Sequence, residues 1–544
     1  MKKLCLFFFL FLTTIAFSQE DAWVYFNAKV NSQSYFDTPL LMLSQRALDR
    51  RTNQNIDLDF KDIPMNQDYI NQIKLISGIK VMAKSKWLNA IHVRGTQTAI
   101  NTLKDFVFVD KIDFANKAFN QSGKTVKRVK TSKISSIKEQ NKTKKIKADF
   151  TYGTSANQIQ MLNGQLLHQQ NYTGSGKIIA VMDAGFPGVN TILPFQRLRD
   201  NNQILGGYNF VARNDNFYVG SSHGTSVLST MGGFKENTLV GTAPDASYYL
   251  FITEDNSSEN PVEESLWVEA AEKADSLGVD IINTSLGYFQ FDNSAYNHTY
   301  NDMNGSTTFM SRGAEIAFSK GMIVVVAAGN EGTTSNPYIA APADAVSVIT
   351  VGAVNATKVR ANFSSIGPSY DGRIKPDVMA QGVSTVLSDG FGTITTSNGT
   401  SFSSPVITGM VASLWQAFPK KTNKEIRELI IKSADRFTVP TNQYGYGIPD
   451  FSLALSSGTL SVSQFSDANF TLYPNPTTDF ISVSFPESFN KGKVIIYTFL
   501  GQKILERDLN GQTDSISLHS LSSGVYIYKI ESDSFSKSGK IIKQ

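Results

Sequence analysis

Short apolar runs alternate with amphipathic segments along the middle of the chain, from about residue 150 to residue 455. Five of these runs predict β-strands, at 177–182, 248–252, 279–283, 322–327 and 347–351. They are apolar without clean alternation, which is typical of strands that are covered on both faces. Helical patterns separate them at 261–277 and 311–320. This alternation predicts an α/β fold with a doubly wound parallel sheet and helices on both faces.

Two flanking regions show other patterns. Residues 22–114 contain strand-like runs at 23–26 and 90–93 and a helix-like segment at 97–103, so we expect a small α+β domain. After residue 470, alternating segments rich in Val, Ile, Phe and Tyr are separated by turn signals, which predicts a small C-terminal all-β sandwich. We therefore predict six parts, with boundaries at 1–18, 19–115, 116–149, 150–455, 456–469 and 470–544.

The N-terminus has the pattern of a secretory signal peptide. An apolar run over residues 4–17 follows two lysines, and Ala16 and Ser18 occupy the positions that a signal peptidase reads. The run is too short for a stable membrane span and no later stretch is apolar enough, so we predict no integral membrane span. Cys5, the only cysteine, lies in this segment. The mature chain therefore has no thiol, which excludes a cysteine hydrolase, disulfides and cysteine-ligated metal sites.

Charge is concentrated in one segment. The formal net charge is +4, yet residues 117–147 carry eleven Lys or Arg against the single acid Glu139, so the rest of the mature chain is mildly acidic. A basic run can bind nucleic acid or an anionic surface. This one is rich in Ser, Thr, Gln and Asn and has no aromatic residue between Phe119 and Phe150. That composition favours a solvated linker, and we predict no nucleic-acid partner.

In parallel sheets, ligands bind at the carboxyl ends of the strands. Four polar residues of this chain lie at a predicted strand end or at the start of the helix that follows. Asp183 ends the first strand, and Asn330 follows the most apolar one. His223 and Ser401 each open a predicted helix beside a glycine. Each residue alone has an ordinary structural explanation, such as a turn or a helix N-cap. The chain order Asp, His, Ser, however, distinguishes one hydrolase fold from two others.

These residues lie in longer motifs. Residues 179–185 read Ile-Ala-Val-Met-Asp-Ala-Gly, residues 223–225 read His-Gly-Thr, and residues 399–405 read Gly-Thr-Ser-Phe-Ser-Ser-Pro. Through these motifs the region from 152 to 446 resembles the catalytic domain of the subtilisin-like (subtilase) serine peptidases. The resemblance implies a subtilisin-like sheet and a secreted serine endopeptidase that hydrolyses peptide bonds in proteins or peptides.

The resemblance also implies a role for each residue. Ser401 would be the nucleophile, His223 the general base, and Asp183 the group that orients His223. Asn330 and the backbone N–H of Ser401 would hold the oxyanion. The pocket for the residue before the cleaved bond would be lined by Ser285, Leu286 and Gly287 on one side and by Ala328 and Gly329 on the other.

Several positions depart from the family pattern. Ala184 stands where Thr or Ser is usual, Ser226 where a second histidine is usual, and Tyr288 where a second glycine is usual after Gly287. Residues 288–306 look like an insertion, which we interpret as a substrate-cleft loop.

The calcium loop of the family is also altered. The stretch 234–241 lacks the usual Asn-rich loop, although Gln158 matches another ligand position. Calcium is therefore compatible with the family but not supported by this sequence, and we expect no cofactor and no metal site.

The flanking regions resemble parts of secreted subtilases. Residues 22–114 resemble the inhibitory propeptides of these enzymes, so the chain's own propeptide is an expected partner, removed near or within the basic linker. The C-terminal motifs, at 472–476, 524–528 and 538–544, resemble the sorting domain of type IX secretion substrates. This implies contact with the type IX machinery, passage through the periplasm and outer membrane, and a secreted or cell-surface location.

Two other functions are alternatives to a peptidase. A catalytically silent surface binding or adhesion protein would keep the fold and lose the chemical residues, and all four are present. A lipase or esterase needs Gly-x-Ser-x-Gly around its nucleophile, and here Ser403 occupies the place of the last glycine.

Overall fold

A computed structural model describes residues 19–120, 150–460, 471–484, 492–498, 501–509, 513–531 and 536–544. The chain forms two compact units, Met1–Gly458 and Thr459–Gln544, and each is described by itself. The predicted signal peptide at 1–18 lies outside the described residues. So do residues 121–149 of the predicted basic linker and residues 461–469 of the predicted second linker.

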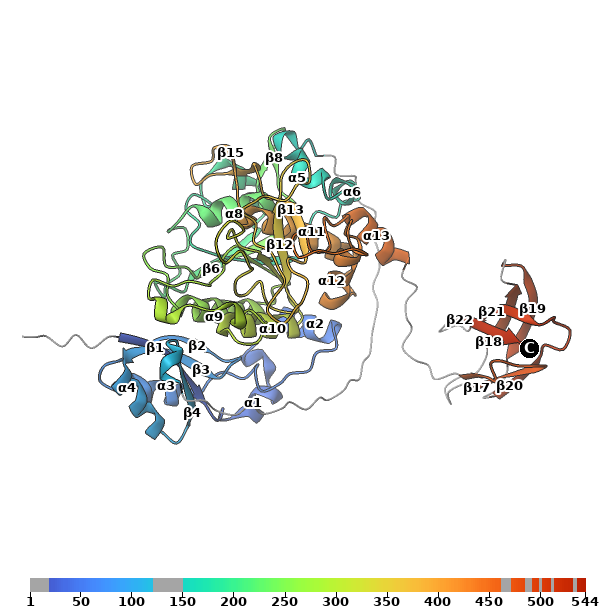
Figure 1. Ribbon diagram of the computed structural model, residues 1–544, viewed down its shortest axis with the longest axis horizontal. Coiled ribbons are helices and arrows are strands. Elements are labelled where there is room, and N and C mark those ends of the chain that lie inside the picture. The colour runs from blue at the N-terminus through green and yellow to red at the C-terminus, as the bar shows by residue number, and fades with distance from the viewer. Residues whose placement is uncertain are drawn as a thin grey trace, which may run out of the picture. The chain divides into compact units, whose positions relative to one another are not determined.

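A parallel seven-stranded sheet forms the centre of the first unit, in the order β13-β12-β11-β10-β5-β9-β6 (Figure 1). Its strands are β5 (Ile178–Asp183), β6 (Ile204–Asn209), β9 (Ser247–Ile252), β10 (Ile281–Thr284), β11 (Ile323–Ala327), β12 (Ile349–Val354) and β13 (Val378–Gln381). The first strand, β5, lies inside the sheet, and later strands extend it in both directions. The predicted doubly wound α/β fold is confirmed. β6 and β13 were not predicted; in β6, two glycines interrupt the apolar run.

Helices cover both faces of this sheet, and the side chains of β5 show how. Ile179 and Val181 pack in one core with α8 (His223–Gly232) and α11 (Thr400–Ala417). Ala180 and Met182 pack in a second core with α9 (Val262–Leu277) and α10 (Phe309–Ser319). Both faces of the strand are therefore apolar, which explains the missing alternation.

Smaller elements complete this part of the unit. They are the helices α5 (Ala156–Gln160), α6 (Gln165–His168), α7 (Gln196–Asp200), α12 (Asn423–Lys432) and α13 (Phe451–Leu460), and the hairpin strands β7 (Phe234–Lys235), β8 (Leu239–Val240), β14 (Thr385–Ser388) and β15 (Ile394–Ser397).

The N-terminal part of the first unit is an antiparallel four-stranded sheet, in the order β2-β3-β1-β4. Its elements are β1 (Gln19–Phe26), α1 (Ser32–Asp37), α2 (Gln45–Asn53), α3 (Gln67–Lys74), β2 (Ile79–Ser85), β3 (Ala90–Thr96), α4 (Gln97–Thr102) and β4 (Val109–Phe114). Tyr25 and Trp87 of this part belong to the same apolar core as α9 and α10. The small sheet therefore packs against these two helices (Figure 1).

The second unit consists of two antiparallel sheets, in the orders β16-β17-β20 and β19-β18-β21-β22. The strands are β16 (Thr471–Tyr473), β17 (Phe480–Ser484), β18 (Gly492–Thr498), β19 (Lys503–Leu509), β20 (Thr513–Ser517), β21 (Gly524–Glu531) and β22 (Ser536–Lys543). Ile481 from one sheet and Val494 and Ile530 from the other share one core. The predicted all-β sandwich is confirmed.

Candidate active site

Asp183 and His223 meet at the carboxyl end of β5. Asp183 is fully buried, and its Oδ1 accepts hydrogen bonds at 2.8 Å from His223 Nδ1 and from the backbone N–H of Ala184. Its Oδ2 is buried without a hydrogen-bond partner among the described residues. The carboxylate charge therefore acts mainly on the imidazole. It raises the pKa of His223 above the ordinary 6.5 and outweighs the opposing effect of burial.

Ser401 is the second residue of α11, and the residue after it contacts His223. The ring of the next residue, Phe402, is 5.7 Å from the imidazole of His223, measured between ring centroids. The Ser401 hydroxyl donates a hydrogen bond to the carbonyl of Ser285 at 3.2 Å. The N–H of Ser401 is among the first four of the helix, which have no acceptor within the helix.

Asn330 follows β11 and is held by Thr400. Asn330 Oδ1 accepts hydrogen bonds from the backbone N–H and the hydroxyl of Thr400, both at 3.0 Å. The Thr400 hydroxyl also accepts a hydrogen bond from the N–H of Gly329 at 3.2 Å. Because the oxygen of the Asn330 amide is occupied in this way, its NH₂ group is left to donate elsewhere. Thr400 was not predicted as a site residue, although it lies in the same sequence motif as Ser401.

A buried chain of hydrogen bonds fixes the end of β10 to α11. Ser285 Oγ donates to the carbonyl of Ser401 at 2.9 Å. Asn283 Nδ2 donates to Ser285 Oγ at 3.2 Å, and Thr408 Oγ1 donates to Asn283 Oδ1 at 2.8 Å. These contacts hold the start of α11 in place relative to the strand ends.

A cavity of about 340 Å³ opens beside Ser401. All five predicted pocket residues line it, and so do Asn330 and Ser401. Phe289 and Gln290 belong to the predicted cleft loop, and sequence reasoning missed the remaining lining residues, which are Ala327, Glu331, Thr334, Ser335, Asn336, Ala340 and Thr400. Most of them lie in loops whose course a sequence pattern does not define.

The segment 288–306, which was interpreted as a cleft loop, has two roles. Phe289 and Gln290 line the cavity. Further along, Tyr296 donates through its hydroxyl to Glu20 at 3.1 Å, and Asp302 pairs with Lys117 at 2.5 Å. The segment therefore connects the cavity with the N-terminal part of the unit.

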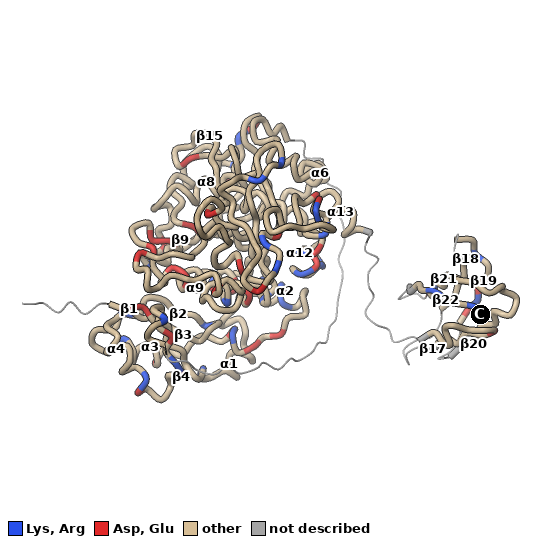
Figure 2. Tube along the Cα trace, viewed as in Figure 1, with Lys and Arg blue, Asp and Glu red and all other residues tan. Residues whose placement is uncertain are grey.

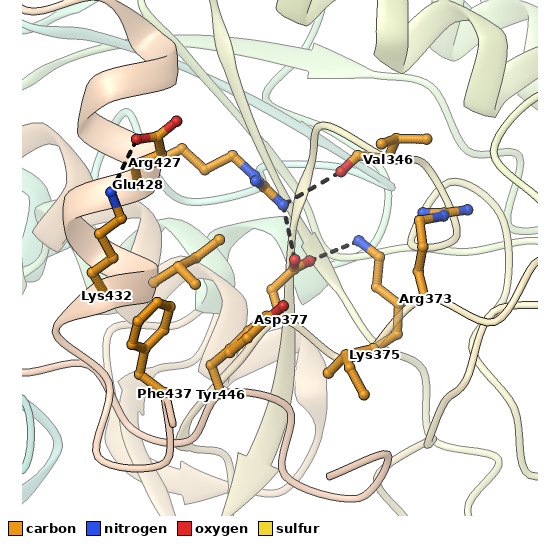
Figure 3. A pocket seen from close by; sticks show the side chains of 11 residues that line it. Val346, Arg373, Lys375, Asp377, Arg427, Glu428, Lys432, Phe437 and Tyr446 are labelled. Carbon is orange, nitrogen blue, oxygen red and sulfur yellow. Dashed lines mark hydrogen bonds and ion pairs between the residues drawn. The ribbon is translucent and has the colours of Figure 1, made fainter. Parts of the chain in front are cut away.

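A second cavity, of about 400 Å³, lies at the opposite edge of the sheet, where Asp377 precedes β13 (Figure 3). Asp377 accepts one hydrogen bond from Lys375 at 2.7 Å and another from Arg427 at 2.9 Å. The Asp377 carboxylate bridges the two cations and so ties α12 to the sheet.

The residues near the family's calcium position make contacts with other parts of the protein. Both ends of the Gln158 side-chain amide are occupied by the backbone of Val386, at 2.9 and 3.2 Å. The stretch 234–241 contains the β7–β8 hairpin. Among the described residues, no group of three or more His, Cys, Asp or Glu side chains is arranged to hold a metal ion.

Comparison with known proteins gives three family matches along the chain. Residues 174–447 match the subtilase family, residues 21–138 match the peptidase S8 propeptide domain of Bacteroidota, and residues 471–544 match the secretion system C-terminal sorting domain.

Individual relatives agree with these matches. Subtilisin NAT of Bacillus subtilis subsp. natto is 34% identical over 292 residues, which are 53% of this chain and 68% of the relative. Subtilisin E of Bacillus subtilis (strain 168) gives the same identity and coverage. Subtilisin of Bacillus pumilus is 32% identical over 293 residues, 53% of this chain and 94% of the relative.

The protein is a secreted serine endopeptidase. The chain belongs to the subtilase family, and it carries the propeptide domain and the sorting domain named above. The sorting domain places it outside the cell or on the outer surface. No helix in the described part of the chain is long and apolar enough to cross a membrane.

Proposed function

We propose that Asp183, His223 and Ser401 form the catalytic triad of this endopeptidase. The observation that carries the proposal is the 2.8 Å hydrogen bond from His223 Nδ1 to the buried Asp183, made beside the start of the helix that carries Ser401. One ring nitrogen of His223 is thereby fixed, and the other remains for a proton from Ser401.

In the proposed reaction, Ser401 Oγ attacks the carbonyl carbon of the scissile peptide bond as His223 takes the hydroxyl proton. The C–N bond then breaks, and His223 gives that proton to the leaving amine. A water molecule attacks the acyl-enzyme with His223 again as base, which releases the acid and restores Ser401. Asp183 stabilises the imidazolium in both steps and stays ionised.

Two donors would stabilise the negative oxygen that forms on the carbonyl, namely the Asn330 NH₂ group and the Ser401 N–H. The Thr400 contacts support this role because they fix the orientation of the Asn330 amide before substrate arrives. The cavity beside Ser401 would take the substrate side chain that precedes the cleaved bond.

We further propose the domain division 19–115, 116–149, 150–455 and 470–544 for propeptide, linker, catalytic domain and sorting domain. The propeptide would inhibit the enzyme until the chain is cut near or within the linker. N-terminal sequencing of the active form tests this, because a mature start at Gln19 contradicts it. We propose that catalysis needs no metal, which activity after dialysis against a chelator tests.

The triad is tested by labelling with a fluorophosphonate, which reacts with activated serine hydroxyls. The processed protein should be labelled on Ser401, as identified by peptide mapping, and a Ser401→Ala variant should not be labelled. A Ser403→Ala variant is the matched control, because the Ser403 hydroxyl is buried two residues further along the same helix and donates to the carbonyl of Thr400. Processed wild-type protein without label would instead indicate a silent binding protein.

A further inference from the structure

A segment between β1 and α3 of the N-terminal part reaches beyond the small sheet. We define it as the arginine arm, residues 44–62, and it contains α2 (Figure 1). The arm contacts the catalytic part at the ends of α9 and α10. The N–H of Ser44 donates to the carbonyl of Ser276 at 2.9 Å, and Gln54 donates to the carbonyl of Gly321 at 2.8 Å. Gly321 comes just before β11, so the arm lies at the amino edge of the parallel sheet, whereas Asn330 and Ser401 lie at its carboxyl edge.

Arginine side chains of the arm bind carbonyl groups at and just beyond the ends of the two helices. Arg50 is 4% exposed and donates to the carbonyls of Val279 and Lys320 and to the carboxylate of Asp275. Arg46 donates to the carbonyl of Gly278 at 2.9 Å. The last carbonyls of a helix have no N–H partner within the helix and carry partial negative charge. The ends of α9 and α10 therefore form a set of acceptors that suits a guanidinium group.

Further charged side chains of opposite sign pair across this contact; Figure 2 colours the Lys and Arg positions blue and the Asp and Glu positions red along the chain. Arg51 donates to Asp275 of the catalytic part at 2.8 Å and to Asp62 of the arm at 2.7 Å. A second pair has the opposite arrangement of charges: Lys320 of the catalytic part donates to Asp62 of the arm at 2.8 Å. All four side chains are at most 2% exposed. Removing one member would leave another charge buried without a partner, which is strongly unfavourable.

The arm extends the contact that the small sheet already makes with α9. The sheet touches this helix from Ser265, which accepts a hydrogen bond from Trp23 at 2.8 Å, to Glu272, which accepts one from the N–H of Trp87 at 2.9 Å. The arm contacts the C-terminal end of α9, from Asp275 onward. The sheet and the arm bind the same rigid helix. When one of them is bound, the effective concentration of the other at its own binding site is higher, so the two contacts reinforce each other.

We propose that the ends of α9 and α10 form a guanidinium-recognising docking site for the arginine arm, and that this site keeps the propeptide bound after the chain has been cut. The inference rests on the proposed cleavage near or within residues 116–149. Since the docking site and Ser401 lie at opposite edges of the sheet, a substrate that enters the cleft does not compete with the arm.

The test uses the full chain with Ser401→Ala, which removes the proposed nucleophile, and with the recognition site of a sequence-specific protease inserted between Lys133 and Ile134. After cleavage by the added protease, the dissociation rate of the N-terminal fragment is measured by gel filtration over time. This readout does not depend on the catalytic proposal. An active Ser401→Ala chain would overturn the triad and leave the docking measurement intact.

Three variants decide the outcome. Arg50→Gln should speed dissociation at least about a hundredfold, as expected when a buried pair loses one partner. Arg46→Gln, whose side chain is 41% exposed, should speed it about tenfold with little risk to folding. Lys61→Gln is the matched control, because Lys61 lies on the same arm and pairs with Asp59 of the arm at 3.5 Å, while Asp59 keeps its own 2.8 Å bond to Lys320 in this variant.

Thermal unfolding of the uncut variants shows whether each has folded. If Arg50→Gln does not fold, the Arg46→Gln rate alone decides. Dissociation of the Arg50→Gln and Arg46→Gln fragments at the Lys61→Gln rate would overturn the proposal, and a faster rate for both would support it.

Discussion

The side-chain oxygen of Asn330 accepts two hydrogen bonds from Thr400, one from its backbone N–H and one from its hydroxyl, both at 3.0 Å. The two residues are separated by 70 positions in the chain. This contact fixes which end of the Asn330 amide is free to donate, and it joins the loop after β11 to the helix that carries Ser401.

Replacing Asn330 should therefore slow the chemical step more than it weakens substrate binding. For Asn330→Ala we expect kcat to fall about 10²–10³-fold with KM nearly unchanged, a range established on a subtilisin for the loss of one oxyanion donor. Thr400→Val should lower kcat less, about tenfold, because the backbone N–H still holds the Asn330 oxygen. Steady-state kinetics on a peptide substrate measure both effects. A rise in KM at constant kcat would show that Asn330 only binds substrate.

Activity should rise with pH through the titration of His223. The base must be neutral, and Asp183 raises the pKa of His223 above 6.5, so activity is lost as pH falls through that raised value. We expect the midpoint of kcat/KM against pH to lie above 6.5 in the wild type. In Asp183→Asn the raising charge is gone, so the residual activity should be about 10⁴-fold lower and its midpoint should move to lower pH. An unchanged midpoint in this variant would contradict the assignment of His223 as the base that Asp183 tunes.

The size of the cavity beside Ser401 should set which substrates are cut. Gly287 lines this cavity, and a Cβ at this position would lie 3.2 Å from the carbonyl oxygen of Ala341. We expect Gly287→Val to lower kcat/KM at least about tenfold for a substrate with Phe before the cleaved bond, and much less for one with Ala, because the added methyl groups narrow the pocket. Fluorophosphonate labelling of Ser401 is the control for an intact catalytic centre. Equal losses for the two substrates would argue against a pocket at Gly287.

Removing the C-terminal unit should abolish export without abolishing activity. Residues 471–544 match the sorting domain, and their apolar core is formed by their own two sheets. A chain that ends at Gly458 should therefore accumulate in the periplasm and still cleave peptides after release by osmotic shock. As a control, fusing residues 459–544 to an unrelated periplasmic protein should send that protein out of the cell. Normal export of the truncated chain would refute the role of the tail.

Local sequence was enough to predict much of the fold and the core of the proposed site. Apolar runs located the interior strands, and the motifs around Asp183, His223 and Ser401 placed each residue at a strand end or helix start, where the structure has it. The pattern missed β6 because its two glycines interrupt the apolar run. It also missed Thr400, which lies beside the proposed nucleophile. The contact between Thr400 and Asn330 forms only when two distant segments of the chain come together.

The sequence by itself determined the fold class, the order of the chemical residues and the sorting tail, because periodicity, turn residues and short motifs act within windows of a few residues. Only the tertiary structure decided that the Ser401 hydroxyl points to Ser285, and that Arg50 docks on Asp275, 225 positions away in the chain. Such contacts depend on which helix ends and strand edges pack together. That packing follows from the burial of whole surfaces and leaves no signal in the residues next to each partner.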